Sequence, residues 1–565
     1  MTHKIKYLVL GGLLGAAGVY AAMNQVVENT QQAQPPKQLT YKDIIQPPAG
    51  DYGQSVYRTI EAHTQTYNTF AAEVQALDPH QVVSKLDPYG TAPLSALVGI
   101  RTEEPRRVEV IVLGNAGDTP TRFKFTALNT VHILPILGLL PDFKNRVQLV
   151  TYKDNGETDQ TYSVTLQTKP LHPETPKPVI EKAKQNNFHH QLYFVTPSEG
   201  EGMGKQTPYS IGLDEQGRIR WAFNPDKGST VLMKPWKEGK WLTFMSNKLA
   251  GERGGSTKYL MAFDLVGRIY QIWPADYRLH HDFEILKDGR VTIATDTDTE
   301  IEDIAITVDL EKNQRLVAND NVRMIEHIQP RPIILDAQVG FLPAYDWFHM
   351  NGIDENPEKG YRVYSGRNQS ATVAINDDNT LRWILADPAG WPPAMQSYLL
   401  KPKGEGFEWS WGQHSPVFRD ADHLFLFDNG NFRAIDFENA KKAHENYSRL
   451  VEYKIHDDRT IEQVWSYGKE RGYELYAPYV GGVDYIPETN SVVGVFGGVI
   501  TNRLGNPSDI VAGTFKNKAH VIEVTHTMPP KVLAEFVFAN KSRQTDLGYM
   551  IYRGSVCHVY CAYAK

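Results

Sequence analysis

The first strongly periodic segment of the chain has the pattern of a helix. Between residues 55 and 77, apolar residues recur every three or four positions, which places them on one face of a helix. Residues 24–50 are polar and contain several prolines, a composition typical of an extended arm. The sequence therefore predicts an arm and one amphipathic helix within residues 24–85.

Residues 86–175 change to an alternation of apolar and polar positions. Such alternation is typical of strands that bury one face. Turn signals such as Asp154-Asn155-Gly156 separate the alternating runs. We therefore expect a small antiparallel β-sandwich that forms an N-terminal domain.

Beyond about residue 190 one phrase recurs, consisting of a strand, a polar turn and a second strand with a large apolar end. We count six copies, whose turns are centred near residues 214, 264, 309, 377, 457 and 525. A unit of about 60 residues is long enough for four strands, and a sheet of that size cannot bury both faces alone. Six such sheets arranged radially would cover one another. The predicted fold class is all-β, with a six-bladed β-propeller over residues 176–565.

The composition agrees with a β-rich chain and argues against one class of partner. Aromatic residues make up 11%, and 44 glycines and 34 prolines interrupt the chain often, as many short strands and turns require. The chain has 59 basic and 66 acidic residues, a formal net charge of −7, with no block of like charge. Nothing in this charge pattern indicates binding to nucleic acid.

Residues 1–23 have the layout of a secretory signal. A short basic start precedes an apolar run from Tyr7, and small residues follow at Ala21 and Ala22. The apolar run is short for a stable membrane span. We expect export to the periplasm, with an uncleaved N-terminal anchor as the alternative.

The chain contains two cysteines, Cys557 and Cys561, near its C-terminus. In an oxidising compartment such a close pair favours a disulfide clip, while two free thiols in a final strand are the alternative.

Three histidines are separated by about one repeat unit each: His281, His349 and His414. Each precedes an alternating apolar strand, where the loops at one end of a propeller channel are expected. A single histidine among aromatic residues is more often a packing residue than a catalyst. The shared spacing favours one functional cluster, to which Arg367 is added because it stands just before a repeat strand.

The residue types in this cluster narrow the chemistry. The chain has no H-E-x-x-H zinc motif, no G-x-S-x-G elbow and no phosphate-binding G-x-x-x-x-G-K-[ST] loop. Asp282 directly follows His281 and leaves a metal site open, but we predict no metal and no cofactor. A neutral imidazole is a nucleophile near physiological pH, and arginine or protonated histidine can hold anionic oxygens. This set suits transfer of a small anionic group through a histidine.

Seven stretches, in order, resemble the bacterial arylsulfate sulfotransferases: "YGTAPLSALVGI", "ILPILGLLPDFKNRVQLV", "HHDFEILKDGR", "DWFHMNG", "SGRNQSATVAI", "GQHSPVF" and "LFDNGNFR". The resemblance runs from about residue 86 to near the end of the chain. That family consists of periplasmic enzymes that move a sulfuryl group from an aryl sulfate to a phenol without a nucleotide donor. The resemblance implies a small β domain ahead of a six-bladed propeller.

The resemblance also implies roles for individual residues. His414 would be the sulfated nucleophile, and either His349 or His281 would protonate the leaving oxygen. The remaining candidates are Arg367 as a catalytic cation, and Asn351, His280 and Gln413 as substrate-binding residues. The chain departs from the family pattern at Gly352 and Gly366, where serine is frequent, and we expect a changed pocket shape rather than a changed mechanism.

The predicted function is therefore a ping-pong sulfotransferase with a sulfohistidine intermediate, acting on an aryl sulfate donor and a phenolic acceptor. Two alternatives remain at this point: a ligand-binding envelope propeller without catalysis, and a quinone-dependent dehydrogenase. A homodimer, the physiological substrates and the identity of the general acid also stay open.

Overall fold

The computed structural model describes residues 51–115, 118–184, 190–199, 205–225, 229–246, 257–297, 301–313, 315–316, 321–333, 346–502, 506–509, 516–539 and 548–564. The predicted signal or anchor at residues 1–23 and most of the predicted arm lie outside these ranges. Among the described residues, no helix is long and apolar enough to cross a membrane.

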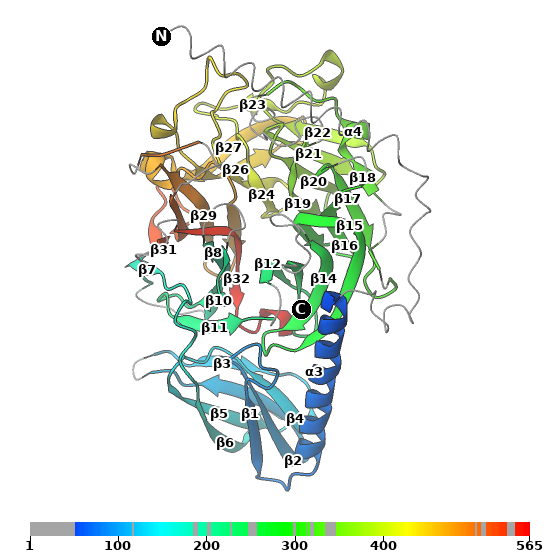
Figure 1. Cartoon of the computed structure of the whole chain (residues 1–565), viewed down its shortest axis with the longest axis vertical. Helices are drawn as coiled ribbons and strands as arrows, with labels where there is room; N and C mark the ends of the chain where they lie inside the picture. The colour runs from blue at the N-terminus through cyan, green and yellow to red at the C-terminus, as the bar shows by residue number, and fades with distance from the viewer. Residues whose placement is uncertain are drawn as a thin grey trace. The chain divides into compact units, whose positions relative to one another are not determined.

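The predicted amphipathic helix is confirmed as α3 (Asp51–Gln75), which begins and ends slightly earlier than the pattern suggested. It contacts strands β2, β4 and β15, and Figure 1 shows it running alongside the blue strands. Its residue Val74 is fully buried. A Cβ atom at Gly99 on β2 would lie 2.1 Å from Val74 Cγ2, so glycine is what lets this helix approach the sheet.

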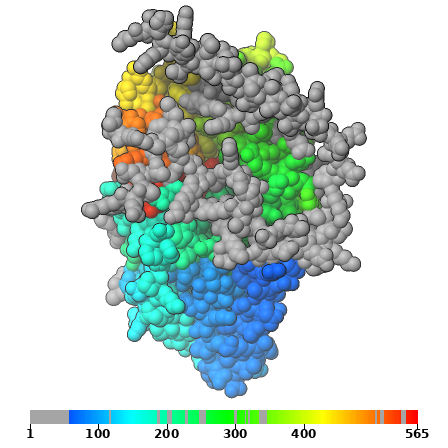
Figure 2. Space-filling model, in the orientation of Figure 1, coloured from blue at the N-terminus to red at the C-terminus, as the bar shows by residue number. Residues whose placement is uncertain are grey.

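The first sheet is antiparallel and contains the strands β1 (Val82–Leu86), β2 (Ala96–Val112), β3 (Thr121–Lys124), β4 (Asn129–Ile136), β5 (Lys144–Tyr152) and β6 (Thr158–Gln167). Its long strand β2 pairs with β1 and β4 through its first half and with β3 and β5 through its second half. This agrees with the predicted alternation, since buried and exposed positions alternate along β5 and β6. In Figure 2 these strands and α3 form the blue surface.

The second sheet joins segments from distant parts of the chain. Its order is β11 (Ile219–Phe223), β10 (Ser210–Leu213), β8 (Gln191–Glu199) and β32 (Tyr549–His558), with β9 (Lys205–Gln206) paired to β8. The C-terminal strand thus completes a sheet that begins near residue 191. Near the end of β32, Cys557 forms a disulfide with Cys561, as the first of our two alternatives expected.

The third sheet has seven strands in sequence order: β12 (Ser229–Pro235), β13 (Lys240–Ser246), β14 (Thr257–Asp264), β15 (Ile269–Ile285), β16 (Val291–Thr295), β17 (Ile304–Val308) and β18 (Asn321–Arg323). Strand β15 pairs with β14 mainly through its first half and with β16 through its second half, with an irregular register between them. One long strand therefore belongs to two groups of four strands. The short helix α4 (Met324–His327) follows.

Three more sheets complete the described part of the chain. The fourth is β19 (Met350–Asn356), β20 (Tyr361–Gly366), β21 (Ala371–Asn376) and β22 (Leu381–Leu385). The fifth is β23 (Lys401–Lys403), β27 (Thr460–Tyr467), β26 (Arg449–Ile455), β25 (His423–Asp428) and β24 (His414–Phe418). The sixth is β28 (Gly482–Ile486), β29 (Ser491–Thr501), β30 (Lys516–Thr525), β31 (Val532–Ala539) and β7 (Val179–Lys182). Short 3₁₀ turns lie at Pro393–Met395, Ala443–Glu445, Lys469–Leu475 and Cys561–Tyr563.

Five of the six repeated phrases form the predicted strand-turn-strand hairpin. These hairpins are β10–β11, β14–β15, β21–β22, β26–β27 and β30–β31. The remaining phrase contributes β17, and part of its second half lies outside the described residues. The structure is thus almost entirely β, as predicted.

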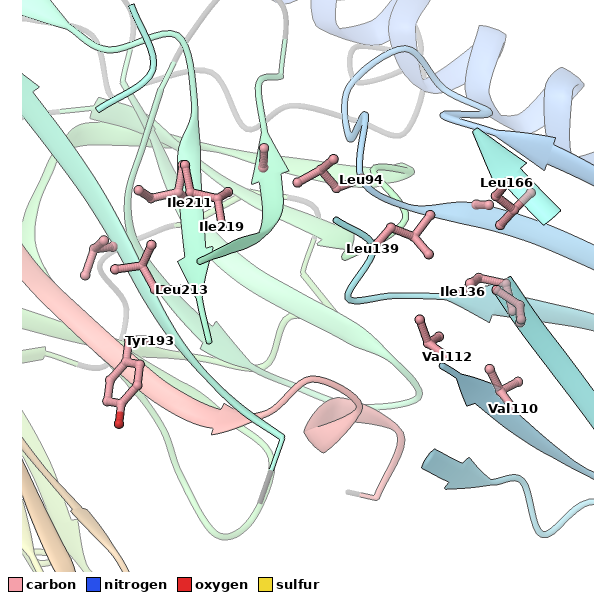
Figure 3. Close-up of a cluster of buried hydrophobic side chains, with 14 of the residues drawn as sticks. Leu94, Val110, Val112, Ile136, Leu139, Leu166, Tyr193, Ile211, Leu213 and Ile219 are labelled. Atoms are coloured by element: carbon pink, nitrogen blue, oxygen red, sulfur yellow. The ribbon is translucent and has the colours of Figure 1, made fainter. Parts of the chain in front are cut away.

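An apolar core extends across the first and second sheets. Figure 3 shows Val110, Ile136 and Leu166 from the first sheet together with side chains of the second sheet, including Tyr193 and Ile211. Each of these side chains is at most 5% exposed. Burial of this continuous apolar surface joins the two sheets into one compact body.

We call β12, β15, β19, β24, β28 and β32 the inner strands, because they contact one another across sheet boundaries in the order β15–β19–β24–β28–β32–β12. Three inner-strand carboxylates each accept a hydrogen bond from a backbone N–H of the next inner strand in that order: Asp282 from Ile353 at 2.9 Å, Asp354 from Phe418 at 2.5 Å, and Asp484 from Val556 at 3.3 Å. These bonds fix the relative positions of the strands that carry the candidate site.

Candidate active site

The candidate residues lie where inner strands are irregular. The pairing register shifts at or beside the candidate positions of β15, β19, β24 and β32. His281, His349 and Ser415 have φ values of 53°, 58° and 54°, in the left-handed region that non-glycine residues rarely adopt. Backbone held in this region costs free energy and is frequent at functional sites. Local irregularity therefore marks His281 and His349, two of the residues that the repeat spacing predicted, and the residue directly after His414.

The structure brings the three histidines together around one tyrosine. The ring centroids of His281 and His349 are 4.6 Å apart. The ring of Tyr552 on β32 stacks on His281 at 5.7 Å and stands edge-on to His414 at 6.5 Å. The predicted cluster thus forms in space, although its members come from different sheets.

His414 is almost completely buried, and its ring has a defined partner. The Nδ1 atom lies 2.7 Å from Oδ1 of Asn429. The Asn429 amide is oriented by its own donor group, since Nδ2 donates to the carbonyl oxygens of Ala477 at 2.8 Å and Val480 at 2.7 Å. Asn429 can therefore only accept from His414, so the proton of the neutral imidazole is on Nδ1 and the lone pair is on Nε2.

The charge state of His414 follows from its surroundings. Burial, together with the nearby positive charge of Arg367, holds the pKa of His414 well below its usual range. The ring is therefore neutral at physiological pH. A neutral imidazole with a free Nε2 lone pair is the nucleophilic form.

His349 has the opposite charge state. Its Nδ1 atom lies 2.6 Å from Glu302 Oε2 and 2.8 Å from Asp346 Oδ2. Burial by itself would lower its pKa, but Asp346 and Glu302 raise the pKa of His349 to about 10. At neutral pH His349 is therefore a cation.

His281 contacts a partner through each ring nitrogen. Nε2 lies 3.0 Å from Oε2 of Glu302, and Nδ1 lies 2.8 Å from the hydroxyl of Tyr552. Glu302 thus interacts with two histidines. Burial would raise the pKa of Glu302, but His349 and His281 hold it well below its ordinary value, so the carboxylate is ionised.

Arg367 is placed to hold an anion. Its backbone N–H donates to the carbonyl of His349 at 3.1 Å, so it is tied to that residue. Its guanidinium has only long contacts, to Asn368 Oδ1 at 3.2 Å and to the carbonyl of Pro478 at 3.4 Å. Burial lowers the pKa of Arg367, as expected for a cation that none of the described carboxylates pairs with.

Asn351 is fixed by two partners. Its Nδ2 donates to the carbonyl of Gln413 at 2.9 Å, and its own carbonyl accepts from Arg553 Nη2 at 2.6 Å. Arg553 is in turn paired with Asp282 at 2.7 Å. Asn351 Oδ1 is buried and has no hydrogen-bond partner among the described residues.

Two predicted binding residues, Gln413 and His280, pack beside the site. The Gln413 side chain is turned toward Ser365 and Gly366, both at 3.4 Å. His280 packs against His281 with ring centroids 5.2 Å apart, and burial lowers its pKa to about 4. The structure thus places both next to the predicted catalytic residues.

Sequence reasoning missed four members of the site. They are Glu302, Asp346, Asn429 and Tyr552. Asp346 stands three residues before His349, and Asn429 lies in the "LFDNGNFR" stretch, so both had a local signal. Glu302 and Tyr552 are far from any predicted site residue and had none.

Two overlapping groups of side chains have the donor types of a metal site: His280 with His281 and Glu302, and Glu302 with Asp346 and His349. In the second group the donor atoms lie 2.6–2.8 Å from His349 Nδ1, which are hydrogen-bond distances. The structure accounts for this group as a pair of carboxylates around one imidazolium.

Comparisons with known proteins point to one enzyme family. The family model for arylsulfotransferases (ASST) matches residues 178–538, and the model for the arylsulfotransferase Ig-like domain matches residues 83–169. The chain is 24% identical over 526 residues to the arylsulfate sulfotransferase AssT of Escherichia coli O6:H1 (strain CFT073), covering 75% of this chain and 86% of that protein. It is 25% identical over 540 residues to AssT of Lelliottia amnigena, covering 76% and 88%.

Solved structures offer a weaker likeness. An auxiliary nutrient binding protein from Bacteroides ovatus has a TM-score of 0.28 and 9% identity, over 82% of this chain and 86% of that one. The family matches cover most of the chain and include every candidate residue from His280 to Asn429. This chain belongs to the arylsulfotransferase family.

Proposed function

We propose that this chain transfers a sulfuryl group from an aryl sulfate ester to a phenol by a ping-pong mechanism, with His414 as the covalent carrier. One observation carries the proposal most directly. Asn429 holds the neutral His414 ring with its lone pair on Nε2. The ring is buried, and the cations Arg367 and Arg553 lie near it. A ligand-binding platform has no need of a histidine whose tautomer is fixed in this way.

In the first half-reaction, Nε2 of His414 attacks the sulfur atom. The N–S bond forms while the bond from sulfur to the aryl oxygen breaks, and the phenol leaves with a proton supplied by the enzyme. Negative charge on the sulfuryl oxygens and on the leaving oxygen requires fixed donors. The Arg367 guanidinium and the His349 imidazolium provide two such charges.

In the second half-reaction, a phenolic acceptor takes the place of the departed phenol. Its oxygen attacks sulfur, the N–S bond breaks, and His414 regains its lone pair while the enzyme takes up the proton of the acceptor. The site returns to its starting charge state, so no cofactor is needed for the cycle. Sulfuryl transfer in both directions through one nucleophile gives ping-pong kinetics.

The proposed fold of the catalytic part is a closed six-bladed propeller over residues 176–565. Five sheets of the described residues follow the sheet of β1–β6. Because β15 belongs to two groups of four strands, these five sheets would supply six blades. The pairing of β8 with β32 would close the ring, and the order of inner-strand contacts supports this arrangement. We also propose that residues 86–175 form a separate sandwich domain and residues 24–85 the arm and helix.

The N-terminal pattern supports a proposal on localisation. We propose that residues 1–23 direct export to the periplasm and are then removed. Fractionation of cells that express the full chain, with N-terminal sequencing of the purified protein, tests both points. An intact N-terminus on membrane-bound protein would support the anchor instead.

Mass spectrometry tests the proposed function directly. The purified protein is exposed briefly to 4-nitrophenyl sulfate without acceptor at neutral or alkaline pH, then digested. A mass gain of about 80 Da on the peptide that contains His414, with an equal amount of nitrophenol released, is expected for a covalent sulfuryl intermediate. The His414→Asn variant should show neither signal, whereas His423→Asn, outside the site, should show both. Nitrophenol release without an adduct on rapid quenching would refute the carrier.

A further inference from the structure

We propose that Tyr552 is the residue that exchanges a proton with the phenol oxygen of the substrate, and that His281, held by Glu302, supplies this proton through it. The inference rests on the proposed sulfuryl transfer and names the general acid that the sequence left open. It assigns a catalytic role to a residue of the C-terminal strand β32.

The geometry forms a chain of three groups. Glu302 Oε2 lies 3.0 Å from His281 Nε2, and the Tyr552 hydroxyl lies 2.8 Å from His281 Nδ1. The Tyr552 ring is stacked on His281 with an interplanar angle of 21°, and it also stands edge-on to the proposed nucleophile His414, at a ring centroid distance of 6.5 Å. Tyr552 thus lies between the proton source and the reacting centre.

His281 is not free to protonate the substrate itself. An imidazole has two sites for protons, and in His281 one is directed to Glu302 and the other to Tyr552. A proton that leaves His281 toward the reacting centre therefore passes through the Tyr552 hydroxyl.

His349 is suited to a different task. Two carboxylates surround its Nδ1 atom, and they keep it protonated far above neutral pH. A general acid must lose its proton and regain it in every cycle, so its pKa should lie near the working pH. His349 therefore serves as a permanent charge for the sulfuryl oxygens, while His281, whose Nδ1 atom contacts the Tyr552 hydroxyl at 2.8 Å, is the histidine placed to exchange the proton.

The neighbouring residue holds Tyr552 in place. Arg553 donates to Asp282 at 2.7 Å and to the carbonyl of Asn351 at 2.6 Å. Asp282 directly follows His281, so this ion pair ties the backbone of β32 to that of β15 next to the histidine. The register shift of β32 between Ile551 and Gly554 contains both Tyr552 and Arg553. The irregular part of β32 therefore keeps Tyr552 in a fixed position next to His281.

The protons balance over both half-reactions. The proposed cycle starts with one proton on each ring nitrogen of His281, directed to Glu302 and to Tyr552. As the sulfur–oxygen bond of the donor breaks, the aryl oxygen takes the proton of the Tyr552 hydroxyl, and Tyr552 takes the Nδ1 proton of His281. The sulfated enzyme then contains neutral His281. When the acceptor phenol attacks sulfur, its proton passes to Tyr552 and the tyrosine proton returns to His281.

The test compares leaving groups of different basicity in Tyr552→Phe. A basic leaving oxygen needs the proton, whereas an acidic nitrophenol leaves nearly as well without it. With phenyl sulfate, kcat/KM should fall about 10²–10⁴-fold, the usual contribution of general acid catalysis. With 4-nitrophenyl sulfate the loss should stay below about tenfold. Equal losses for the two donors, or no loss for either, would overturn the proposal.

Two controls make the outcome specific. Tyr479→Phe removes a hydroxyl from the same apolar cluster, where it donates to Asn517 at 2.6 Å, so it should affect both donors equally and weakly. In a His281→Asn background, Tyr552→Phe should cause little further loss with phenyl sulfate, because the two residues act in one path. If the loss in the double variant equalled the product of the two single losses, the relay would be wrong.

The proposal can fail separately from the proposed function. If 4-nitrophenyl sulfate still adds about 80 Da to the His414 peptide in Tyr552→Phe, and the losses for the two donors are equal, the carrier stands and the relay is wrong. If the unsubstituted protein forms no adduct, the proposed function fails first.

Discussion

Removal of the Asn429 side chain should slow sulfation of His414 far more than it weakens the fold. In Asn429→Ala, His414 Nδ1 loses the acceptor at 2.7 Å that fixes its tautomer. The proton is then free to occupy Nε2, which removes the attacking lone pair, and the ring is free to rotate. Where a serine protease loses the residue that sets the tautomer of its histidine, the rate falls about 10⁴-fold, which is an upper limit here.

The lower limit comes from the single hydrogen bond. A buried neutral hydrogen bond contributes about 0.5–1.5 kcal/mol, and about 1.4 kcal/mol corresponds to a factor of ten. Loss of the tautomer preference alone should therefore slow the reaction about tenfold, and loss of ring orientation adds to this. We expect a total decrease of about 10²-fold in the rate of adduct formation, between these limits.

The cost to stability is smaller. The carbonyl of Ala477 keeps a hydrogen bond from Ser448 Oγ at 3.3 Å, whereas the carbonyl of Val480 loses its donor at 2.7 Å. One unpaired buried carbonyl costs about 1–3 kcal/mol. Against the usual domain stability of about 5–15 kcal/mol, the variant should remain folded.

Rapid-quench measurement of the first turnover with 4-nitrophenyl sulfate gives the rate of adduct formation. The matched control is Asn431→Ala, which removes the same amide from the same turn. Asn431 is buried, and its amide has no hydrogen-bond partner among the described residues. Its loss should leave the rate unchanged. A first turnover in Asn429→Ala as fast as in the unsubstituted protein would refute the tautomer argument.

Three further predictions concern charge and packing. The pKa of His349 is raised from 6.5 to about 10, so its stabilising contribution is complete below pH 6.5 and is lost as pH rises through 10. Over this pH window, Tm should fall more steeply in the unsubstituted protein than in His349→Gln. Parallel curves of Tm against pH for the two proteins would contradict this. Arg367→Lys should slow adduct formation about 10²–10³-fold at unchanged Tm, because lysine lacks the planar pair of donors; an unchanged rate would remove Arg367 from the site. Gly99→Ala should lower the denaturation free energy by about 1–3 kcal/mol, because its Cβ overlaps Val74, while kcat stays constant; an unchanged denaturant midpoint would show that α3 can shift.

Much of the architecture could be predicted because its determinants are local. Each repeated phrase contains the alternation and the turn of one hairpin, and these signals survive in any surroundings. The shared strand β15 could not be predicted in the same way. Its 17 residues join two groups of strands, and only the pairing partners on either side show where one group ends.

In the candidate site, too, residues with a local sequence signal could be predicted and residues that depend on distant partners could not. His281, His349 and His414 were found because consecutive members of this set stand about one repeat unit apart. Glu302 and Tyr552 were not, because each takes its role from a partner on another strand, 21 residues away for Glu302 and 271 for Tyr552. The charge of a histidine depends on such partners. Sequence spacing could therefore locate the histidines but could not say which one is neutral.

The two glycines that depart from the family pattern illustrate this limit further. We expected Gly352 and Gly366 to change the shape of the pocket. In the structure, a Cβ atom at Gly352 would lie 2.3 Å from Pro416 Cδ, and one at Gly366 would lie 2.3 Å from the ring of Phe348. The first contact lies between the inner strands β19 and β24. The second involves Phe348, the residue just before His349.

These glycines therefore pack against residues that flank the candidate histidines, and the expected change in pocket shape stays a prediction. Pro416 follows His414 by two residues, so the close approach at Gly352 sets the distance between β19 and β24. A larger residue at Gly366 would push Phe348 and with it His349, whose charge depends on 2.6 Å and 2.8 Å contacts to Glu302 and Asp346. Since the attraction between opposite charges weakens as such contacts lengthen, the packing of Gly366 against Phe348 helps to keep His349 charged.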